Sequence, residues 1–272
     1  MYVGTRGHDF DANSIEELAK KCKQFNIHHV QLALKKSISG FKEGSFSEEY
    51  ARSIGEELKK NDIRVSVLGC YINPSDTNEE QLKKSLDFFV ENLHYAKYIG
   101  ADMVGLETGF VGEILDIGKN RTEEAYQYLL KNMKYLCSEA EKLGVKIGIE
   151  GVSCFVIHSP EMMRRLVDDL NSDNVCVIFD PVNYIDITNY KNQSEIFDKY
   201  FELLANDTAV MHLKDYRLDG ENLTYAYPNT GLLNTAELIK KMNAIKPEIA
   251  VILEEVREDK LTEIKKEIEK LI

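Results

Sequence analysis

The sequence predicts an α/β protein, folded as a single (β/α)8 TIM barrel domain over residues 1–272. Eight short apolar runs alternate with longer amphipathic stretches, which is the pattern of strands followed by helices. Successive runs begin roughly 30 to 40 residues apart, the length of one βαβ unit. The total of 272 residues suits a barrel, which takes about 250. A doubly wound open sheet is the alternative, but no GxGxxG motif follows the first apolar run.

The eight runs define the expected strands. Several are apolar almost throughout, such as residues 175–179 and 249–253, as expected for parallel strands covered on both faces. In chain order the expected strands are Tyr2–Thr5, His29–Leu34, Ile63–Gly69, Asp102–Glu107, Val145–Glu150, Val175–Asp180, Ala209–Lys214 and Ile249–Glu254.

The stretches between the strands carry helix start and stop signals. Ser14 and Ser47 each precede acidic residues, so we expect them to cap the first turns of two helices. Gly100 and Gly144 end helical patterns immediately before strands, where glycine adopts the left-handed conformation that terminates a helix. These signals place the helices between the strands, as a barrel requires.

The amino-acid composition argues against some classes of protein function. With 43% hydrophobic and 29% charged residues, the chain is typical of a soluble globular protein. The net charge of −12 disfavours nucleic acid as a partner. No apolar run reaches the roughly 20 residues that span a bilayer, and the first residues do not resemble a signal peptide, so we expect no membrane association and a cytoplasmic location. No exposed apolar stripe demands a partner subunit, and a homo-oligomer stays an open alternative.

Charged side chains end the last four expected strands. Active sites of TIM barrels lie at the carboxyl ends of the strands, so these residues are expected to meet at one rim. A carboxylate leaving a buried strand is costly unless it is paired or bound to a cation, so the group predicts a divalent metal site. Oxygen and imidazole ligands suit Mn²⁺, Mg²⁺, Co²⁺ or Zn²⁺ and do not select one. The expected ligands are Glu150, Asp180, His212 and Glu254.

Two adjacent glutamates compete for the last of these positions. Aligning Ile149-Glu150 with Leu253-Glu254 favours Glu254 over Glu255. Each of these four residues could instead be an ordinary loop residue or an ion-pair partner. A metal site is favoured because all four occur at the ends of neighbouring strands.

Other strand ends supply candidate substrate contacts. Arg6 suits a carboxylate or phosphate, although an ion pair with Asp9 is the alternative. Lys214 would add positive charge beside the metal, or be a solvated loop residue. The segment from Tyr225 to Gly231 is expected in a long loop after the seventh strand. The candidate substrate-binding residues are Arg6, His8, Asn73, Glu107, Asn183 and Arg217, with support of a metal ligand as the alternative for Asn183.

Motifs along the whole chain resemble those of the xylose isomerase-like TIM barrels, a superfamily of sugar phosphate isomerases and epimerases. The similar segments are Gly4-Thr-Arg-Gly-His-Asp9, Val67-Leu-Gly-Cys-Tyr-Ile-Asn73, Gly105-Leu-Glu-Thr-Gly109, Ile149-Glu-Gly151, Phe179-Asp-Pro-Val-Asn183, Met211-His-Leu-Lys-Asp215 and Leu253-Glu254. By analogy with the ketose 3-epimerases of this superfamily, Glu150, Asp180, His212 and Glu254 would bind the metal.

The resemblance implies proton abstraction next to a carbonyl of a sugar or sugar phosphate, with Glu150 and Glu254 as catalytic bases and a metal-stabilised ene-diolate. The substrate-binding set departs from the epimerases. They have a histidine where this chain has Asn183, and an arginine at the position of Leu218, one residue beyond Arg217. The identity of the sugar therefore does not transfer.

Three other functions are alternatives to the isomerase or epimerase. A lyase of the inosose dehydratase type would use the same site, and a catalytically silent barrel would serve as a ligand-binding module. A DNA-repair nuclease of the endonuclease IV type is disfavoured by the negative charge and by only six histidines.

Overall fold

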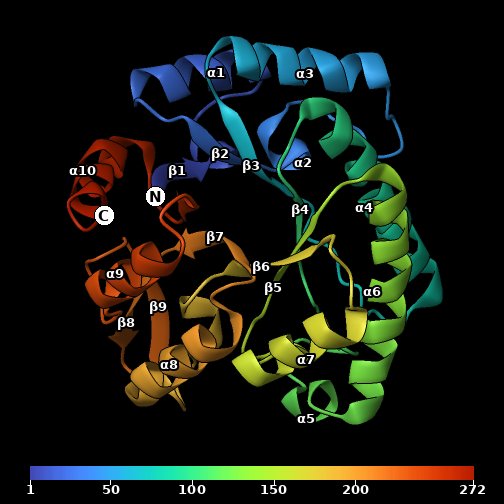
Figure 1. Cartoon of the computed structure of the whole chain (residues 1–272), viewed down its shortest axis with the longest axis vertical. Coiled ribbons are helices and arrows are strands. Elements are labelled where there is room, and N and C mark those ends of the chain that lie inside the picture. The colour runs from blue at the N-terminus through green and yellow to red at the C-terminus, as the bar shows by residue number, and fades with distance from the viewer.

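The computed structural model describes residues 1–272 and forms a closed parallel barrel of eight strands (Figure 1). Around the barrel the strands follow the order β1-β10-β7-β6-β5-β4-β3-β2, so neighbours in the chain are neighbours in space apart from an inserted hairpin, and the last strand closes on the first. The strands are β1 Tyr2–Arg6, β2 His29–Leu32, β3 Arg64–Gly69, β4 Val104–Glu107, β5 Ile147–Glu150, β6 Val175–Phe179, β7 Thr208–Leu213 and β10 Ala250–Leu253. The predicted (β/α)8 barrel is confirmed.

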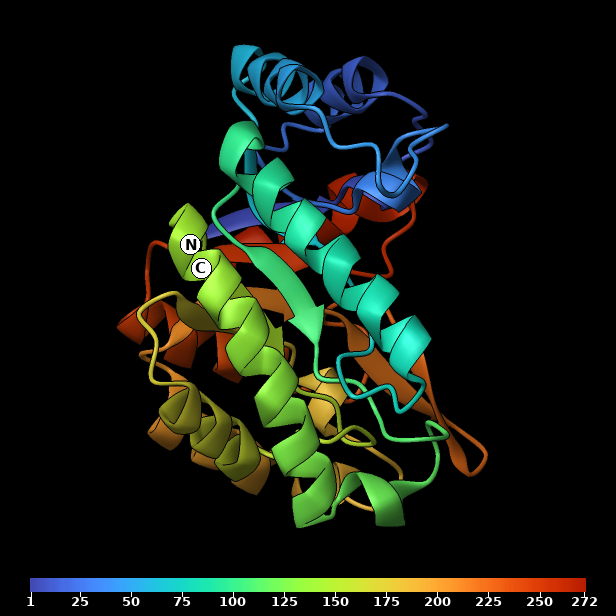
Figure 2. The same cartoon turned by 90° about the vertical axis from the view of Figure 1, so that its right-hand side faces the viewer.

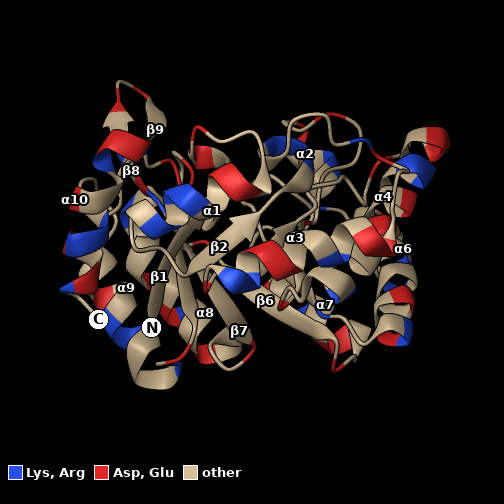
Figure 3. Cartoon of the chain, turned by 90° about the horizontal axis from the view of Figure 1, so that it is seen from above, with Lys and Arg blue, Asp and Glu red and all other residues tan.

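Helices surround the barrel, and the two longest, α4 and α6, run side by side along one flank (Figure 2). The helices are α1 Ile15–Gln24, α2 Leu34–Ser37, α3 Glu48–Lys60, α4 Glu79–Ile99, α5 Ile117–Asn120, α6 Glu123–Leu143, α7 Pro160–Leu170, α8 Gln193–Leu204, α9 Thr235–Ile245 and α10 Glu258–Glu269. None of them combines the length and apolar character needed to cross a bilayer. Basic and acidic residues are interspersed along the helices (Figure 3).

The predicted helix ends are present. The Ser14 hydroxyl accepts a hydrogen bond from the backbone N–H of Glu17, and the Ser47 hydroxyl accepts one from Tyr50, so each satisfies an N–H that the helix leaves free. Gly100 and Gly144 end α4 and α6 with φ of 81° and 66°, which L-residues rarely adopt.

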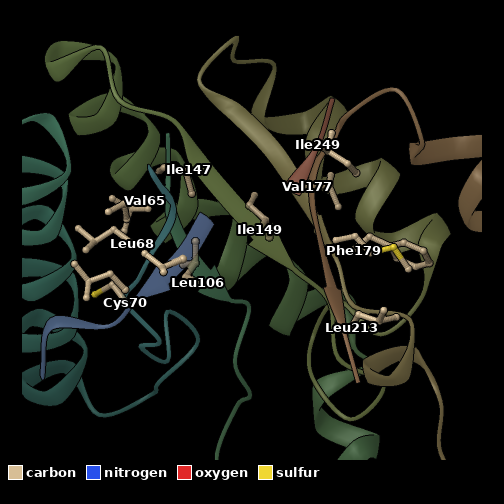
Figure 4. Close-up of a cluster of buried hydrophobic side chains, with 14 of the residues drawn as sticks. Val65, Leu68, Cys70, Leu106, Ile147, Ile149, Val177, Phe179, Leu213 and Ile249 are labelled. Atoms are coloured by element: carbon tan, nitrogen blue, oxygen red, sulfur yellow. The ribbon is translucent and has the colours of Figure 1, made fainter. Parts of the chain in front are cut away.

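Side chains alternate between the two faces of each strand and form two apolar layers. The outer layer lies between strands and helices and includes Ile149, Val177 and Phe179 (Figure 4). There the Phe179 ring stacks on Tyr200 of α8 with centroids 3.7 Å apart. The inner layer fills the barrel with seven residues: Val67, Met103, Cys176, Ile178, Val210, Ala250 and Ile252. We call these seven residues the barrel plug. Because they fill the barrel interior, polar side chains that face inward can gather only at an end of the barrel.

One element was not predicted. The expected loop after the seventh strand instead begins with an antiparallel hairpin, β8 Asp215–Asp219 and β9 Asn222–Ala226, which projects from the mouth (Figure 3). Gly220 occupies its turn with φ of 61°. The assignment of Tyr225 to a loop was wrong: Tyr225 lies in β9, paired with Tyr216.

Candidate active site

The strand alternation places polar side chains on top of the barrel plug. Along β6, Cys176 and Ile178 fill the interior, and Asp180 is the next residue on that face. Along β7, Val210 fills the interior, and the inward side chains that follow are His212 and Lys214. The same spacing brings together the buried side chains of Glu150, Asp180, His212, Lys214 and Glu254 at the carboxyl ends of four adjacent strands.

His212 lies between two glutamates. Its Nδ1 is 3.3 Å from Glu150 Oε2 and 3.3 Å from Glu254 Oε1, yet neither approach has hydrogen-bond geometry. Both ring nitrogens and Glu150 Oε2 are buried without a partner. Ligands about 2.1 Å from a tetrahedral ion are separated by about 3.4 Å, so these spacings suit donor atoms arranged around a metal. Ligand atoms of Glu150, Asp180 and His212 lie within 4.8 Å of one another, and the residues present fit a divalent ion.

The two carboxylates on β5 and β6 are oriented by the turn after β6. Asp180 Oδ1 accepts hydrogen bonds from the backbone N–H groups of Val182 and Asn183, 2.9 and 3.3 Å away. The Asn183 side-chain amide donates to Glu150 Oε1 at 2.6 Å. Asn183, predicted to bind substrate, thus holds Glu150 with its other oxygen directed at His212.

Lys214 forms ion pairs with two carboxylates of this group. Its ammonium is 3.0 Å from Glu254 Oε2 and also forms an ion pair with Asp180 Oδ2. The side chain is only 5% exposed, so this is a buried charge and not the solvated loop lysine that the sequence allowed. Burial alone would lower the lysine pKa, but Asp180 and Glu254 outweigh it and raise that pKa well above its usual value.

Burial and charge separate the pKa values of the other groups. Burial raises the pKa of Asp180 to about 6 despite Lys214. The pKa of Glu254 falls to about 2 because Lys214, His212 and Arg6 outweigh its burial. Burial would lower the pKa of His212, but Glu150 and Glu254 raise it to about 8.

Glu107 extends the acidic cluster onto β4. It pairs in register with Glu150, which places the two carboxyl groups side by side on adjacent strands. Burial, and secondarily Glu150, raise the pKa of Glu107 to about 8.

Two polar residues at the mouth were missed in the sequence. Gln31 of β2 is buried, donates to the Tyr71 hydroxyl at 2.8 Å and leaves its Oε1 without a partner. Burial and the negative charge of Glu150 raise the pKa of the Tyr71 hydroxyl well above its usual value. A glutamine inside the otherwise apolar run Val30-Gln-Leu-Ala-Leu34 was the available signal for Gln31.

Arg6, at the end of β1, forms ion pairs with Asp9 and Glu255. Arg6 donates two hydrogen bonds of 2.9 Å to Asp9, as in the alternative considered for it, and one of 3.1 Å to Glu255. It also lies 3.9 Å from Glu254 Oε2. Glu254 is buried beside His212, whereas Glu255 is 41% exposed, so the register favouring Glu254 for the inward position agrees with the structure.

His8 is half-buried in the turn after β1, and its Nδ1 is without a partner. Burial, together with the positive charges of Arg6 and Lys36, lowers the pKa of His8 to about 4. The ring is therefore neutral near pH 7.

Two residues predicted to contact substrate make other interactions in the structure. Asn73 accepts hydrogen bonds from the backbone N–H groups of Ser75 and Phe110 and donates to the Phe110 carbonyl, so its amide joins two loops. Arg217 is exposed and pairs with Thr224 across the hairpin. Because neighbouring residues of a strand point to opposite faces, Arg217 faces away from the side on which Tyr225 approaches Lys214.

Comparison with known proteins agrees with this architecture. A D-tagatose 3-epimerase-like protein matches with a TM-score of 0.76 and 18% identity, covering 100% of this chain and 98% of the other. The IOLI protein, solved with a bound zinc atom, gives a TM-score of 0.75 and 15% identity over 100% of this chain and 96% of its own. The probable 3-DHS dehydratase AsbF of Bacillus anthracis gives 0.75 and 11% identity, with 98% of each chain covered.

At these identities the structural likeness establishes the fold. No curated protein matches the sequence. The sequence model of one family, described as xylose isomerase-like TIM barrel, matches residues 19–272. The chain therefore belongs to the xylose isomerase-like TIM barrel family.

Proposed function

We propose that the protein is a divalent-metal-dependent isomerase or epimerase that moves a proton next to the carbonyl group of a sugar or sugar phosphate. One observation carries this proposal: buried His212 has two unpartnered ring nitrogens and lies 3.3 Å from carboxylate oxygens of both Glu150 and Glu254. The epimerase-like name of one structural neighbour and the zinc atom bound by another support it.

Glu150, Asp180, His212 and Glu254 would hold the ion. A divalent ion at this position would polarise the substrate carbonyl and offset the negative charge that develops on its oxygen. Zinc or magnesium fits this donor set, as do Mn²⁺ and Co²⁺.

The two glutamates are suited to move the proton. In the barrel order β10-β7-β6-β5, Glu254 and Glu150 extend from the outer strands, and His212 and Asp180 from the inner ones. Oε2 of Glu150 and Oε1 of Glu254, which come from different strands, both lie 3.3 Å from His212 Nδ1, so one carboxylate would remove a proton and the other would return it. This placement favours epimerisation, which needs a base on each face of the substrate carbon.

Hydroxyl groups of the substrate would be bound by Gln31, Tyr71 and Glu107. The Gln31 carbonyl oxygen is buried and free to accept a hydrogen bond. A Glu107 carboxyl with a pKa of about 8 keeps a proton at neutral pH and so donates one.

Proton exchange is the test. The chelator-treated protein is incubated with Mn²⁺ and a panel of ketoses, inososes and their phosphates in D2O, and deuterium at carbon is followed by NMR. We expect exchange in the wild type and a loss of about 100-fold or more in Glu150→Gln and Glu254→Gln. Glu255→Gln, at the exposed neighbouring position, is the matched control and should retain exchange.

The same experiment separates the alternatives. A dehydrated keto-deoxy product would identify a lyase on this site. Absence of both exchange and bound metal, measured by elemental analysis, would reject the proposal and favour the silent ligand-binding barrel.

A further inference from the structure

Lys214 is bonded to the oxygens that a metal ion would need. Oδ1 of Asp180 already accepts two backbone N–H groups, so Oδ2 is the oxygen left for a ligand, and it is ion-paired with Lys214. Oε2 of Glu254 is bonded to the same ammonium at 3.0 Å. The Lys214 ammonium therefore occupies oxygens of Asp180 and Glu254, two of the four residues expected to bind the metal.

The ring of Tyr225 offers this ammonium a second stabilising position nearby. The centroid of the Tyr225 ring is 5.4 Å from Lys214 Nζ, within the range of a cation–π interaction. Lys214 directly precedes β8, and Tyr225 lies on β9 of the hairpin that begins there, so one short segment carries both groups. Tyr225 is 58% exposed, which leaves its ring accessible from the mouth.

The charges indicate that Lys214 moves aside and does not leave the site. Glu150, Asp180 and Glu254 supply three negative charges when ionised, and Lys214 offsets one. The remaining two equal the charge of a divalent ion. A lysine kept at the edge of the site therefore leaves the metal-loaded group neutral, whereas its complete removal would leave one buried charge uncompensated.

Resting on the proposed metal site, we propose that Lys214 is an internal counter-cation that competes with the metal. In the metal-free protein its ammonium binds Asp180 and Glu254; when a divalent ion binds, the ammonium turns to the ring of Tyr225. The lysine thereby lowers metal affinity, and Tyr225 partly restores it by stabilising the displaced position.

The test is a double-mutant cycle on metal affinity. Mn²⁺ binding to chelator-treated protein is measured by isothermal titration calorimetry for the wild type, Lys214→Met, Tyr225→Leu and the double variant. We expect Lys214→Met to bind Mn²⁺ at least about tenfold more tightly, because a competing charged group is removed. Tyr225→Leu should bind about three- to tenfold more weakly in the wild-type background and show no change in the Lys214→Met background.

Two controls keep the side chains matched. Tyr225→Phe retains the ring and should bind as the wild type does. Lys214→Arg retains the charge and pairs with carboxylates through two N–H groups, so it should bind Mn²⁺ no more tightly than the wild type.

Without metal, Lys214→Met should melt at a lower temperature than the wild type, and Mn²⁺ should reduce that difference. If Lys214→Met does not fold, the Tyr225→Leu and Lys214→Arg affinities decide the question.

The outcomes distinguish this inference from the proposed function. Equal Mn²⁺ affinities in wild type and Lys214→Met, or a Tyr225→Leu effect that persists without Lys214, overturn the competition while the metal site stands. Absence of Mn²⁺ binding in both wild type and Lys214→Met rejects the metal site itself, and the competition with it.

Discussion

Asp215 is expected to hold the hairpin that carries Tyr225 in place. The residue is fully buried at the start of β8. Its Oδ1 accepts hydrogen bonds from the backbone N–H groups of Tyr216 and Leu233, 2.7 and 2.9 Å away, and its Oδ2 accepts one of 2.8 Å from Gly231. One carboxylate thus joins the base of the hairpin to the loop that follows it.

The cost of removing this carboxylate follows from those contacts. In Asp215→Ala the N–H groups of Tyr216 and Leu233 lose their partner in a buried region, at about 1–3 kcal/mol each. Water can replace the bond to the more exposed Gly231. We therefore expect the free energy of unfolding to fall by about 3–5 kcal/mol, and the melting temperature by about 6–15 °C for a chain of this size.

Urea denaturation and calorimetry measure the loss. Asp215→Asn should fall between wild type and Asp215→Ala, because an amide keeps the shape but replaces one accepting oxygen with a donor. Asp219→Ala, at the exposed end of β8, is the control and should change stability by less than about 0.5 kcal/mol. A loss below about 1 kcal/mol in Asp215→Ala would refute the view that this carboxylate anchors the hairpin.

Three further predictions concern the barrel and the metal. A Cβ at Gly148 would lie 2.6 Å from Met103 Sδ and 2.9 Å from Ile178 Cδ1, so Gly148→Ala should destabilise by about 1–3 kcal/mol in urea denaturation. Phe179→Ala, which empties a fully buried aromatic position, should cost about 3–5 kcal/mol in the same assay. Mn²⁺ at about 100 times its dissociation constant should raise the unfolding free energy by about 2.7 kcal/mol, and this gain should be lost in His212→Ala, as followed by calorimetry.

The fold and the ends of the strands could be predicted because both follow from short-range patterns. Apolar runs of strand length, helix caps and glycine stops recur along the chain, and two-residue alternation determines which residue beyond the barrel plug faces the mouth. The position of Glu150, Asp180, His212 and Glu254 at the ends of the apolar runs was enough to select them. The hairpin was missed because its strands contain polar residues and lack a continuous apolar run, although Asp219-Gly220 is a recognised hairpin turn signal.

Alternation is also compatible with an inward-facing Lys214, the last residue of the expected seventh strand. His212 faces the barrel interior, and the residue two positions later faces the same side as long as the chain stays extended. The sequence offered no means to choose between that placement and a solvated loop lysine. The choice depends on the two carboxylates that meet the ammonium, Asp180 and Glu254, which come from other strands.

Asn73 and Asn183 show why the roles of loop residues could not be predicted in the same way. Both asparagines follow a barrel strand by a few residues, and both were candidate substrate contacts, with support of a metal ligand as the alternative for Asn183. The loop conformation turns the amide of Asn73 toward Ser75 and Phe110, with which it makes three hydrogen bonds, whereas Asn183 lies in a turn that brings its amide to Glu150. An amide that orients the Glu150 carboxylate and an amide that joins two loops are chemically identical in the sequence. The difference arises from which acceptor the backbone turn places within hydrogen-bond distance, so the function of such residues is set by tertiary geometry alone.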